Sequence, residues 1–157
     1  MNTLPHWWQN GVIYQIYPKS FQDTTGSGTG DLRGVTQRLD YLKTLGIDAI
    51  WLTPFYISPQ IDNGYDVANY IAIDPAYGTL DDFDELVAQA HARGIRIVLD
   101  MVFNHTSTQH AWFRESLKKE SPYRQFYIWR DGTPEQRPNN WRSIFGGNAW
   151  DWHAESE

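Results

Sequence analysis

The chain has 157 residues, of which 41% are apolar, no cysteine, and a formal charge of −6. This length suits one hydrophobic core, and the lack of cysteine excludes disulfide bonds, thiolate metal sites and cysteine nucleophiles. No apolar run approaches the roughly 20 residues of a membrane span, and the acidic balance argues against a nucleic-acid partner. No basic segment followed by an apolar one comes after Met1, so we expect a cytoplasmic protein without a secretory signal. The aromatic residues (8 Trp, 9 Tyr and 7 Phe) suit either a core or surfaces that stack on sugar rings.

The first part of the chain alternates strand-like and helix-like patterns. Residues 12–17 form a β-rich run that Pro18 stops, and residues 47–52 form a second, apolar run. Between these runs, apolar side chains recur at steps of three and four residues as far as Gly46, which predicts one helix. The apolar positions of this helix are Leu32, Val35, Leu39, Leu42 and Leu45.

A second helix and a third strand follow a long loop. Thr79 predicts an N-cap, with Asp82 three residues later, and Gly94 predicts the end of that helix. Residues 95–102 form the third apolar run. Strands and helices therefore alternate, and the strands have the composition of strands buried on both faces. This order predicts an α/β fold that begins with a parallel sheet.

Beyond Asn104 the pattern loses its regular period. Residues 112–117 predict a short helix that Pro122 ends, and several Gly and Pro residues interrupt the aromatic-rich stretch that follows. We therefore divide the chain into residues 1–104, a βαβαβ part, and residues 105–157, an incomplete inserted subdomain.

Two polar clusters follow predicted strands, at the end where parallel α/β folds place their functional residues. The first runs from Asp100 to His105. A carboxylate near the end of an apolar strand is costly unless it meets a partner or a ligand. Together the two side chains offer an acceptor and a donor for sugar hydroxyls. A structural aspartate and a structural histidine fit the pattern equally well.

The second cluster is Asp62-Asn63-Gly64-Tyr65-Asp66, after the second predicted strand. Gly64 permits a tight turn that presents Tyr65 as a stacking platform between two carboxylates. A plain polar turn is the alternative interpretation.

Residues 23–31 form a loop rich in oxygen atoms and glycine. It predicts either a weak calcium site, with Asp23 and Asp31 as candidate ligands, or a plain loop with Asp31 near the start of the next helix. It is not a phosphate-binding P-loop, because no Gly-Lys-Ser/Thr follows.

Four segments in order resemble the α-amylase superfamily of glycoside hydrolases: residues 8–32, 62–66, 100–105 and 145–150. Within it they look like the oligo-1,6-glucosidase and α-glucosidase branch, and most like the subgroup that hydrolyses trehalose 6-phosphate. Calcium-binding relatives usually carry Asp-Ser-Asn-Gly-Asp-Gly-Ile-Gly-Asp near residues 22–31. Here Thr25 and Ser27 replace two of those ligands, so we expect no cofactor and no tight calcium site.

The resemblance implies an α/β fold that is the N-terminal part of a (β/α)8 TIM barrel. Its first three strands would be present, with the start of an inserted subdomain after strand 3. Asp100 and His105 would bind hydroxyls of the terminal glucose, Tyr65 would stack against its ring, and Asp62 would help to close the pocket. Phe145 would line the pocket from the inserted subdomain. Asn104 belongs to the same motif and receives a structural role.

The implied reaction is retaining hydrolysis of an α-glucosidic bond, which needs a nucleophilic carboxylate and a carboxylic acid about 5–5.5 Å apart. In this family these groups follow the fourth and fifth strands, and no Asp or Glu of this chain matches them. We therefore expect an N-terminal fragment, inactive alone, of a monomeric parent enzyme whose substrate is a small sugar or sugar phosphate. An oligo-1,6-glucosidase or broad α-glucosidase is one alternative, and a non-catalytic sugar-binding module is another.

Overall fold

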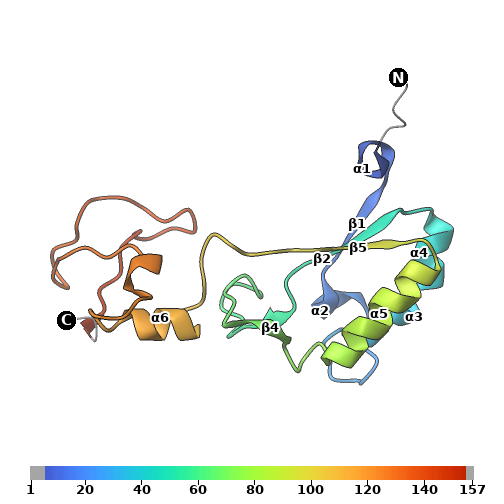
Figure 1. Cartoon of the computed structure of the whole chain (residues 1–157), viewed down its shortest axis with the longest axis horizontal. Helices are drawn as coiled ribbons and strands as arrows, with labels where there is room; N and C mark the ends of the chain where they lie inside the picture. Colours follow the sequence, from blue (N-terminus) through green and yellow to red (C-terminus); the bar gives the residue numbers. More distant parts are fainter. Residues whose placement is uncertain (1–5, 155–157) are drawn as a thin grey trace. The chain divides into compact units, whose positions relative to one another are not determined.

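The computed structural model describes residues 6–154, which divide into two compact units between Ser107 and Thr108. The first unit contains a parallel three-stranded sheet with the strand order β1-β2-β5 (Figure 1). Its strands are β1 (Ile13–Ile16), β2 (Ala49–Leu52) and β5 (Arg96–Leu99). Ile16 lies opposite Leu52, and Leu52 lies opposite Leu99, so the three strands end side by side. The three predicted strands are confirmed, each shorter than the run that predicted it.

Helices connect the strands of this sheet, and α5 runs beside α3 (Figure 1). They are α3 (Leu32–Gln37), α4 (Leu39–Leu45) and α5 (Leu80–Ala92). The single helix predicted over this first stretch is wrong, because Arg38 leaves the helical conformation (φ −99°, ψ 5°) and separates α3 from α4. The Arg38 side chain hydrogen-bonds to that of Gln22 in the preceding loop. Gly46 follows in the left-handed conformation (φ 85°), which is the predicted stop.

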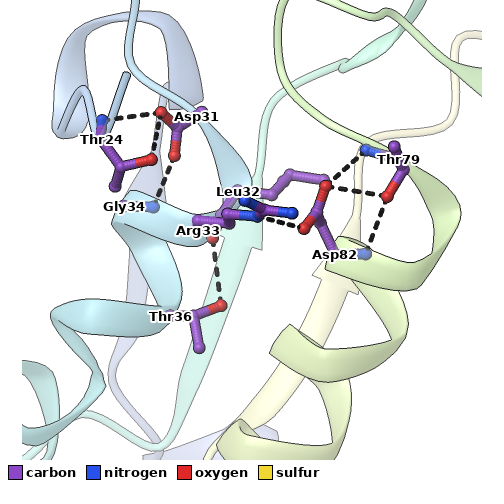
Figure 2. A network of polar contacts seen from close by, with 8 residues as sticks. All are labelled: Thr24, Asp31, Leu32, Arg33, Gly34, Thr36, Thr79 and Asp82. Carbon is purple, nitrogen blue, oxygen red and sulfur yellow. Dashed lines mark hydrogen bonds and ion pairs between the residues drawn. The ribbon is translucent and has the colours of Figure 1, made fainter. Parts of the chain in front are cut away.

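Polar side chains fix the starts of α3 and α5 and join the two helices (Figure 2). Asp31 is the N-cap of α3 and accepts a hydrogen bond from the Gly34 N–H at 2.7 Å. Thr79 and Asp82 form the predicted capping box of α5, in which each side chain accepts a hydrogen bond from the other residue's N–H. Asp82 also pairs with Arg33 Nε of α3 at 2.5 Å, which ties the first turns of the two helices together.

The main core lies between the sheet and these helices. Most apolar positions at helical spacing, together with the strand residues that face them, are almost fully withdrawn from solvent, whereas the predicted position Leu45 is 52% exposed. Burying one such side chain stabilises the fold by about 1.5–3 kcal/mol. The core residues include Ile16, Leu32, Val35, Leu39, Leu42, Ile50, Leu52, Leu86, Ala90 and Ile95.

An antiparallel pair of strands that the sequence did not predict follows β2. It consists of β3 (Tyr56–Ile57) and β4 (Asn69–Ile73). A second, smaller core of Tyr56, Val67 and Val102, with Tyr65 and Tyr70 packed against it, forms beside this pair. The Ser107 N–H donates to the Val67 carbonyl at 2.9 Å, so the chain after β5 is held against the hairpin.

Two four-residue helices flank β1, and neither was predicted. They are α1 (Trp7–Asn10) and α2 (Pro18–Phe21). Pro18 therefore does more than end the strand, since it occupies the first position of α2, where a missing N–H costs nothing.

The second unit has little regular structure: α6 (Ala111–Ser116) and the 3₁₀ helix η1 (Arg124–Phe126). The helix predicted over residues 112–117 is confirmed. Phe113 packs edge-on against Tyr127 and stacks against Trp129. The Arg124 guanidinium lies 3.8 Å from the Trp129 ring centroid and donates to the Ser116 carbonyl at the end of α6. Within residues 6–154, no helix has the length and apolar character that crossing a lipid bilayer requires.

Candidate sugar-binding site

The first residues beyond the three parallel strands are Tyr17, Thr53 and Asp100, close to the carboxyl end of the sheet. The Thr53 N–H donates to the Ile16 carbonyl at 3.0 Å, and the Asp100 N–H donates to the Leu52 carbonyl at 3.2 Å. Tyr17 Oη and Thr53 Oγ1 are buried, and neither has a hydrogen-bond partner among the described residues. Buried polar atoms of this kind are usually satisfied by other groups of a protein, by water or by a ligand. The end of the sheet thus presents polar groups with unused hydrogen-bonding capacity.

Asp66 organises the loop between β3 and β4. One of its carboxylate oxygens accepts from Ser58 Oγ at 2.7 Å and from the Asp62 N–H at 3.2 Å, and the other accepts from the Ile61 N–H at 2.9 Å. Burial alone would raise the pKa of Asp66. The hydrogen bonds from Ser58 and the two backbone N–H groups outweigh that effect and hold the pKa of Asp66 below its ordinary value. Asp66 is therefore an internal support of the loop.

Glycine is required at position 64 for two reasons. Gly64 has φ of 100°, in the left-handed region, and a Cβ atom there would lie 2.9 Å from the Pro54 carbonyl oxygen. The Tyr65 N–H closes the turn by donating to the Asp62 carbonyl at 2.9 Å. The predicted tight turn at Gly64 is confirmed.

Tyr65 and Asp100 come from different predicted clusters, and the structure brings them together. Tyr65 Oη donates to Asp100 Oδ2 at 2.9 Å. Burial, the hydrogen bond to Asp100 and the negative charge of that carboxylate raise the pKa of Tyr65 to about 12. The phenol therefore stays protonated, and Asp100 stays in contact with the loop that follows the second strand of the sheet.

His105 is held by both of its ring nitrogens. His105 Nε2 lies 2.9 Å from the Tyr65 carbonyl, and His105 Nδ1 lies 3.1 Å from Asn104 Nδ2. A carbonyl accepts only, so Nε2 carries the proton, and Nδ1 accepts from the Asn104 amide. Asn104 thus fixes the histidine, which agrees with the structural role predicted for it. To bind a sugar hydroxyl, His105 must exchange one of these contacts for the ligand.

The other two predicted site residues are placed less closely. Asp62 is half-buried in the same loop, and its charge contributes to the raised pKa of Tyr65. Phe145 belongs to the second unit, where its side chain is 80% exposed. The structure therefore brings together Tyr65, Asp100 and His105, with Asp62 on the same loop as Tyr65.

An open cleft of about 650 Å³ lies next to this cluster. Tyr65 forms one wall of it, and the end of β1, α2 and Thr53 form the others. Its lining residues are Tyr14, Gln15, Ile16, Tyr17, Ser20, Phe21, Thr53, Asn63 and Tyr65. An aromatic ring beside carboxylate and imidazole groups suits a ligand that has both a flat apolar face and hydroxyls, as a sugar has.

The loop of residues 23–31 does not fit a calcium ion. N–H groups of Thr25, Gly26 and Gly28 donate to the Asp23 carboxylate at 2.7–2.9 Å, and they lower the pKa of Asp23 to about 2, with the Gly28 bond the largest cause. Asp31 accepts from Thr24 and caps α3 (Figure 2). Hydrogen-bond donors therefore surround the oxygens that would face a cation. Among the described residues, no three Asp, Glu or His side chains gather as a metal site.

Sequence reasoning missed Tyr70, although its hydroxyl contacts the segment that carries His105. Tyr70 Oη lies 2.5 Å from the Val102 carbonyl and 2.9 Å from the His105 carbonyl. Only the unpredicted hairpin brings β4 to this segment, so the sequence offered no signal for these contacts.

Comparison with known proteins supplies the family. Residues 15–157 match the alpha amylase catalytic domain. The trehalose-6-phosphate hydrolase of Escherichia coli K12 is 85% identical to this chain over all 157 residues, which correspond to 28% of that enzyme. The oligo-1,6-glucosidase of Heyndrickxia coagulans is 58% identical over 95% of the chain and 27% of its own length.

Solved structures agree with these relatives. The crystal structure of Bacillus licheniformis trehalose-6-phosphate hydrolase has a TM-score of 0.90 at 58% identity, over 96% of this chain and 27% of that one. The isomaltulose synthase of Erwinia rhapontici has a TM-score of 0.94 at 53% identity, over 98% of this chain and 28% of its own. The three parallel strands are thus the N-terminal part of the family's barrel, and this chain belongs to the alpha-amylase catalytic-domain family.

Proposed function

We propose that these 157 residues form the N-terminal part of a hydrolase that splits trehalose 6-phosphate into glucose and glucose 6-phosphate with retention of configuration. The chain spans about 28% of the length of the curated relative that is 85% identical to it, so the activity belongs to the longer protein. That identity, which extends over the whole chain, is the observation that carries the proposal. In this proposal residues 1–104 contribute to the barrel, and residues 105–157 contribute to the subdomain inserted after its third strand.

The proposed role of the cluster described above is to bind the glucose ring that the enzyme transfers. Asp100 uses one oxygen to hold Tyr65, and the other is available to accept from a sugar hydroxyl. Tyr65 presents its ring to the apolar face of the sugar, and His105 donates to a hydroxyl after exchanging a protein contact. Asp62 closes the end of the pocket, and Phe145 lines it from the inserted subdomain.

The nucleophile and the general acid come, in this proposal, from the remainder of the longer protein. Two carboxyl groups about 5–5.5 Å apart are needed, one to form the covalent glucosyl intermediate and one to protonate the leaving oxygen. Asp100 has a different role in this proposal, because its contact with Tyr65 places it in the glucose-binding cluster.

The substrate's charge bears on where the reaction takes place. A phosphorylated sugar carries about −1.5 to −2 charges at neutral pH, and a charged group crosses the centre of a lipid bilayer only at high cost. A substrate phosphorylated inside the cell therefore stays there, which supports the cytoplasm as the proposed compartment. We further propose that the enzyme acts as a monomer.

Hydrolysis of α-1,6-linked glucosides is the second candidate. The 58% identity to an oligo-1,6-glucosidase over 95% of the chain supports it. Both candidate activities would use the same glucose-binding cluster. Their substrates differ in the group attached to that glucose.

Assaying the full-length enzyme on trehalose 6-phosphate and on isomaltose separates the candidates. We expect kcat/KM for trehalose 6-phosphate to exceed that for isomaltose, and glucose and glucose 6-phosphate to form in equal amounts. A preference for isomaltose would reject the phosphotrehalase proposal and favour the oligo-1,6-glucosidase. The 157-residue chain alone is expected to hydrolyse neither substrate.

A further inference from the structure

Tyr70 lies on β4, and its hydroxyl reaches the segment that follows β5. Tyr70 Oη is 2.5 Å from the Val102 carbonyl and 2.9 Å from the His105 carbonyl. A phenol has one proton, so the two carbonyls share it or alternate as its acceptor. These carbonyls are three residues apart, so one side chain contacts both ends of the segment 102–105.

The same segment carries His105, one of the residues proposed to bind glucose. Asp100 precedes it and holds the Tyr65 hydroxyl, while His105 ends it and contacts the Tyr65 carbonyl. Tyr65, Asp100 and His105 are thus linked across two loops. The Tyr70 hydroxyl supports this arrangement from the hairpin side, through the backbone carbonyl of His105.

The Tyr70 hydroxyl can be separated from the Tyr70 ring. The ring packs in the second core, with its centroid 6.0 Å from that of Tyr56. Changing Tyr70 to Phe keeps the aromatic ring and removes the donor to the two carbonyls. Tyr56 provides a matched control, because its hydroxyl contacts Met101 Sδ at 3.0 Å, and a thioether sulfur is a weak acceptor.

We propose that Tyr70 is a positioning residue for the glucose-binding site: its hydroxyl fixes the backbone of residues 102–105 and thereby holds His105 in place beside Tyr65 and Asp100. Tyr70 does not touch the sugar. This inference rests on the proposed function, because it takes His105 as a ligand of the substrate.

The expected effect follows from the loss of one hydrogen bond. A net hydrogen bond between neutral groups corresponds to a factor of roughly 3–10 in an equilibrium constant. We therefore expect Tyr70→Phe to lower kcat/KM by about that factor. A group that binds the sugar equally well in the ground state and the transition state affects mainly KM, so we expect KM and the inhibition constant of glucose to rise while kcat changes less.

The test is a double-mutant cycle in the full-length enzyme. Tyr70→Phe, His105→Ala and the double variant are compared with the wild type, and Tyr56→Phe serves as the control for a lost hydroxyl in the same core. p-Nitrophenyl α-glucopyranoside is the common probe, because it has an α-glucosyl group, as the substrates of both the phosphotrehalase and the oligo-1,6-glucosidase candidate do. A wild type that cleaves this probe but not trehalose 6-phosphate refutes the proposed substrate and still allows the Tyr70 inference to be tested.

The cycle distinguishes positioning from a general structural role. If Tyr70 acts through His105, Tyr70→Phe loses most of its effect on KM in the His105→Ala background, and Tyr56→Phe leaves KM near the wild-type value. An equal loss in both backgrounds, or no loss in either, would overturn the proposal. So would a Tyr70→Phe enzyme that fails to fold, because the hydroxyl would then be needed for the fold itself. A wild type that cleaves no α-glucoside would overturn both this inference and the enzyme class.

Discussion

The clearest prediction concerns Asp66, the carboxylate that holds the loop carrying Asp62 and Tyr65. In Asp66→Asn, the single amide oxygen can replace the carboxylate oxygen that accepts from Ser58 and Asp62. The amide NH2 group then faces the Ile61 N–H, donor against donor, and that 2.9 Å hydrogen bond is lost.

The size of the effect follows from this geometry. Hydrogen bonds to charged groups contribute about 1.5–3 kcal/mol, and the lower end applies because Ile61 is 83% exposed and water can replace the lost acceptor. About 1.5 kcal/mol corresponds to roughly tenfold in an equilibrium constant. If the ordered loop is the form that binds substrate, kcat/KM of the Asp66→Asn enzyme falls by up to about tenfold, mainly through KM.

The assay measures kcat and KM of the full-length enzyme, with Asp84→Asn as the matched control. Asp84 is an exposed residue of α5, so Asp84→Asn removes the same charge at a position outside the loop. An unchanged KM in Asp66→Asn, or an equal rise in Asp84→Asn, would show that Asp66 does not order the site. The lowered pKa adds a second readout. The stability that Asp66 contributes is present above the ordinary carboxyl pKa and is lost as the pH falls through its lowered value, and this loss should be absent from the Asn variant.

Three further predictions concern the loop of residues 23–31, Gly64 and Tyr65. EDTA is expected to leave the melting temperature and the activity of the full-length enzyme unchanged, because N–H groups already surround Asp23; a loss that Ca²⁺ restores would contradict this. A left-handed alanine costs about 1–2 kcal/mol, and Gly64→Ala is expected to destabilise the enzyme by more than this, because its Cβ would meet the Pro54 carbonyl oxygen. The control Gly26→Ala, at φ 76° with open space around it, should cost only that amount. Equal melting temperatures of the two variants would refute the steric argument. The ultraviolet difference between wild type and Tyr65→Phe should show a phenol that titrates near pH 12, so its contribution to stability is complete below the ordinary pKa of about 10 and is lost as the pH rises through about 12. Titration near 10 would mean that neither the burial of Tyr65 nor its bond to Asp100 persists in solution.

The parallel sheet and α5 could be predicted because their signals are local. An apolar run marks each strand, and the capping pair Thr79 and Asp82 marks the start of α5. The break at Arg38 could not be predicted, because the apolar positions keep helical spacing on both sides of it. The side chain of Arg38 contacts Gln22 of the preceding loop, 16 residues earlier, and such a contact leaves no periodic pattern in the sequence.

The hairpin shows a second limit of sequence patterns. β3 has two residues, and the eleven residues between β3 and β4 lack the short turn that marks most hairpins. The Tyr70 contacts depend on that pairing, and both acceptors are backbone carbonyls, which every residue carries. Tyr65 and Asp100 were each predicted from their own strand ends, but the hydrogen bond between them depends on how the turn at Gly64 folds back.

The order of strands in the parallel sheet has a practical consequence. β1 and β5 are its outer strands, so each has one edge that pairs with no other strand of the described residues, and β5 is only half-buried. Unpaired edges act as templates for a partner of matching register. A second polypeptide carrying the remaining strands of the barrel would therefore meet two prepared docking edges, and co-expression of the two pieces offers a route to a split enzyme whose glucosidase activity reports their reassembly.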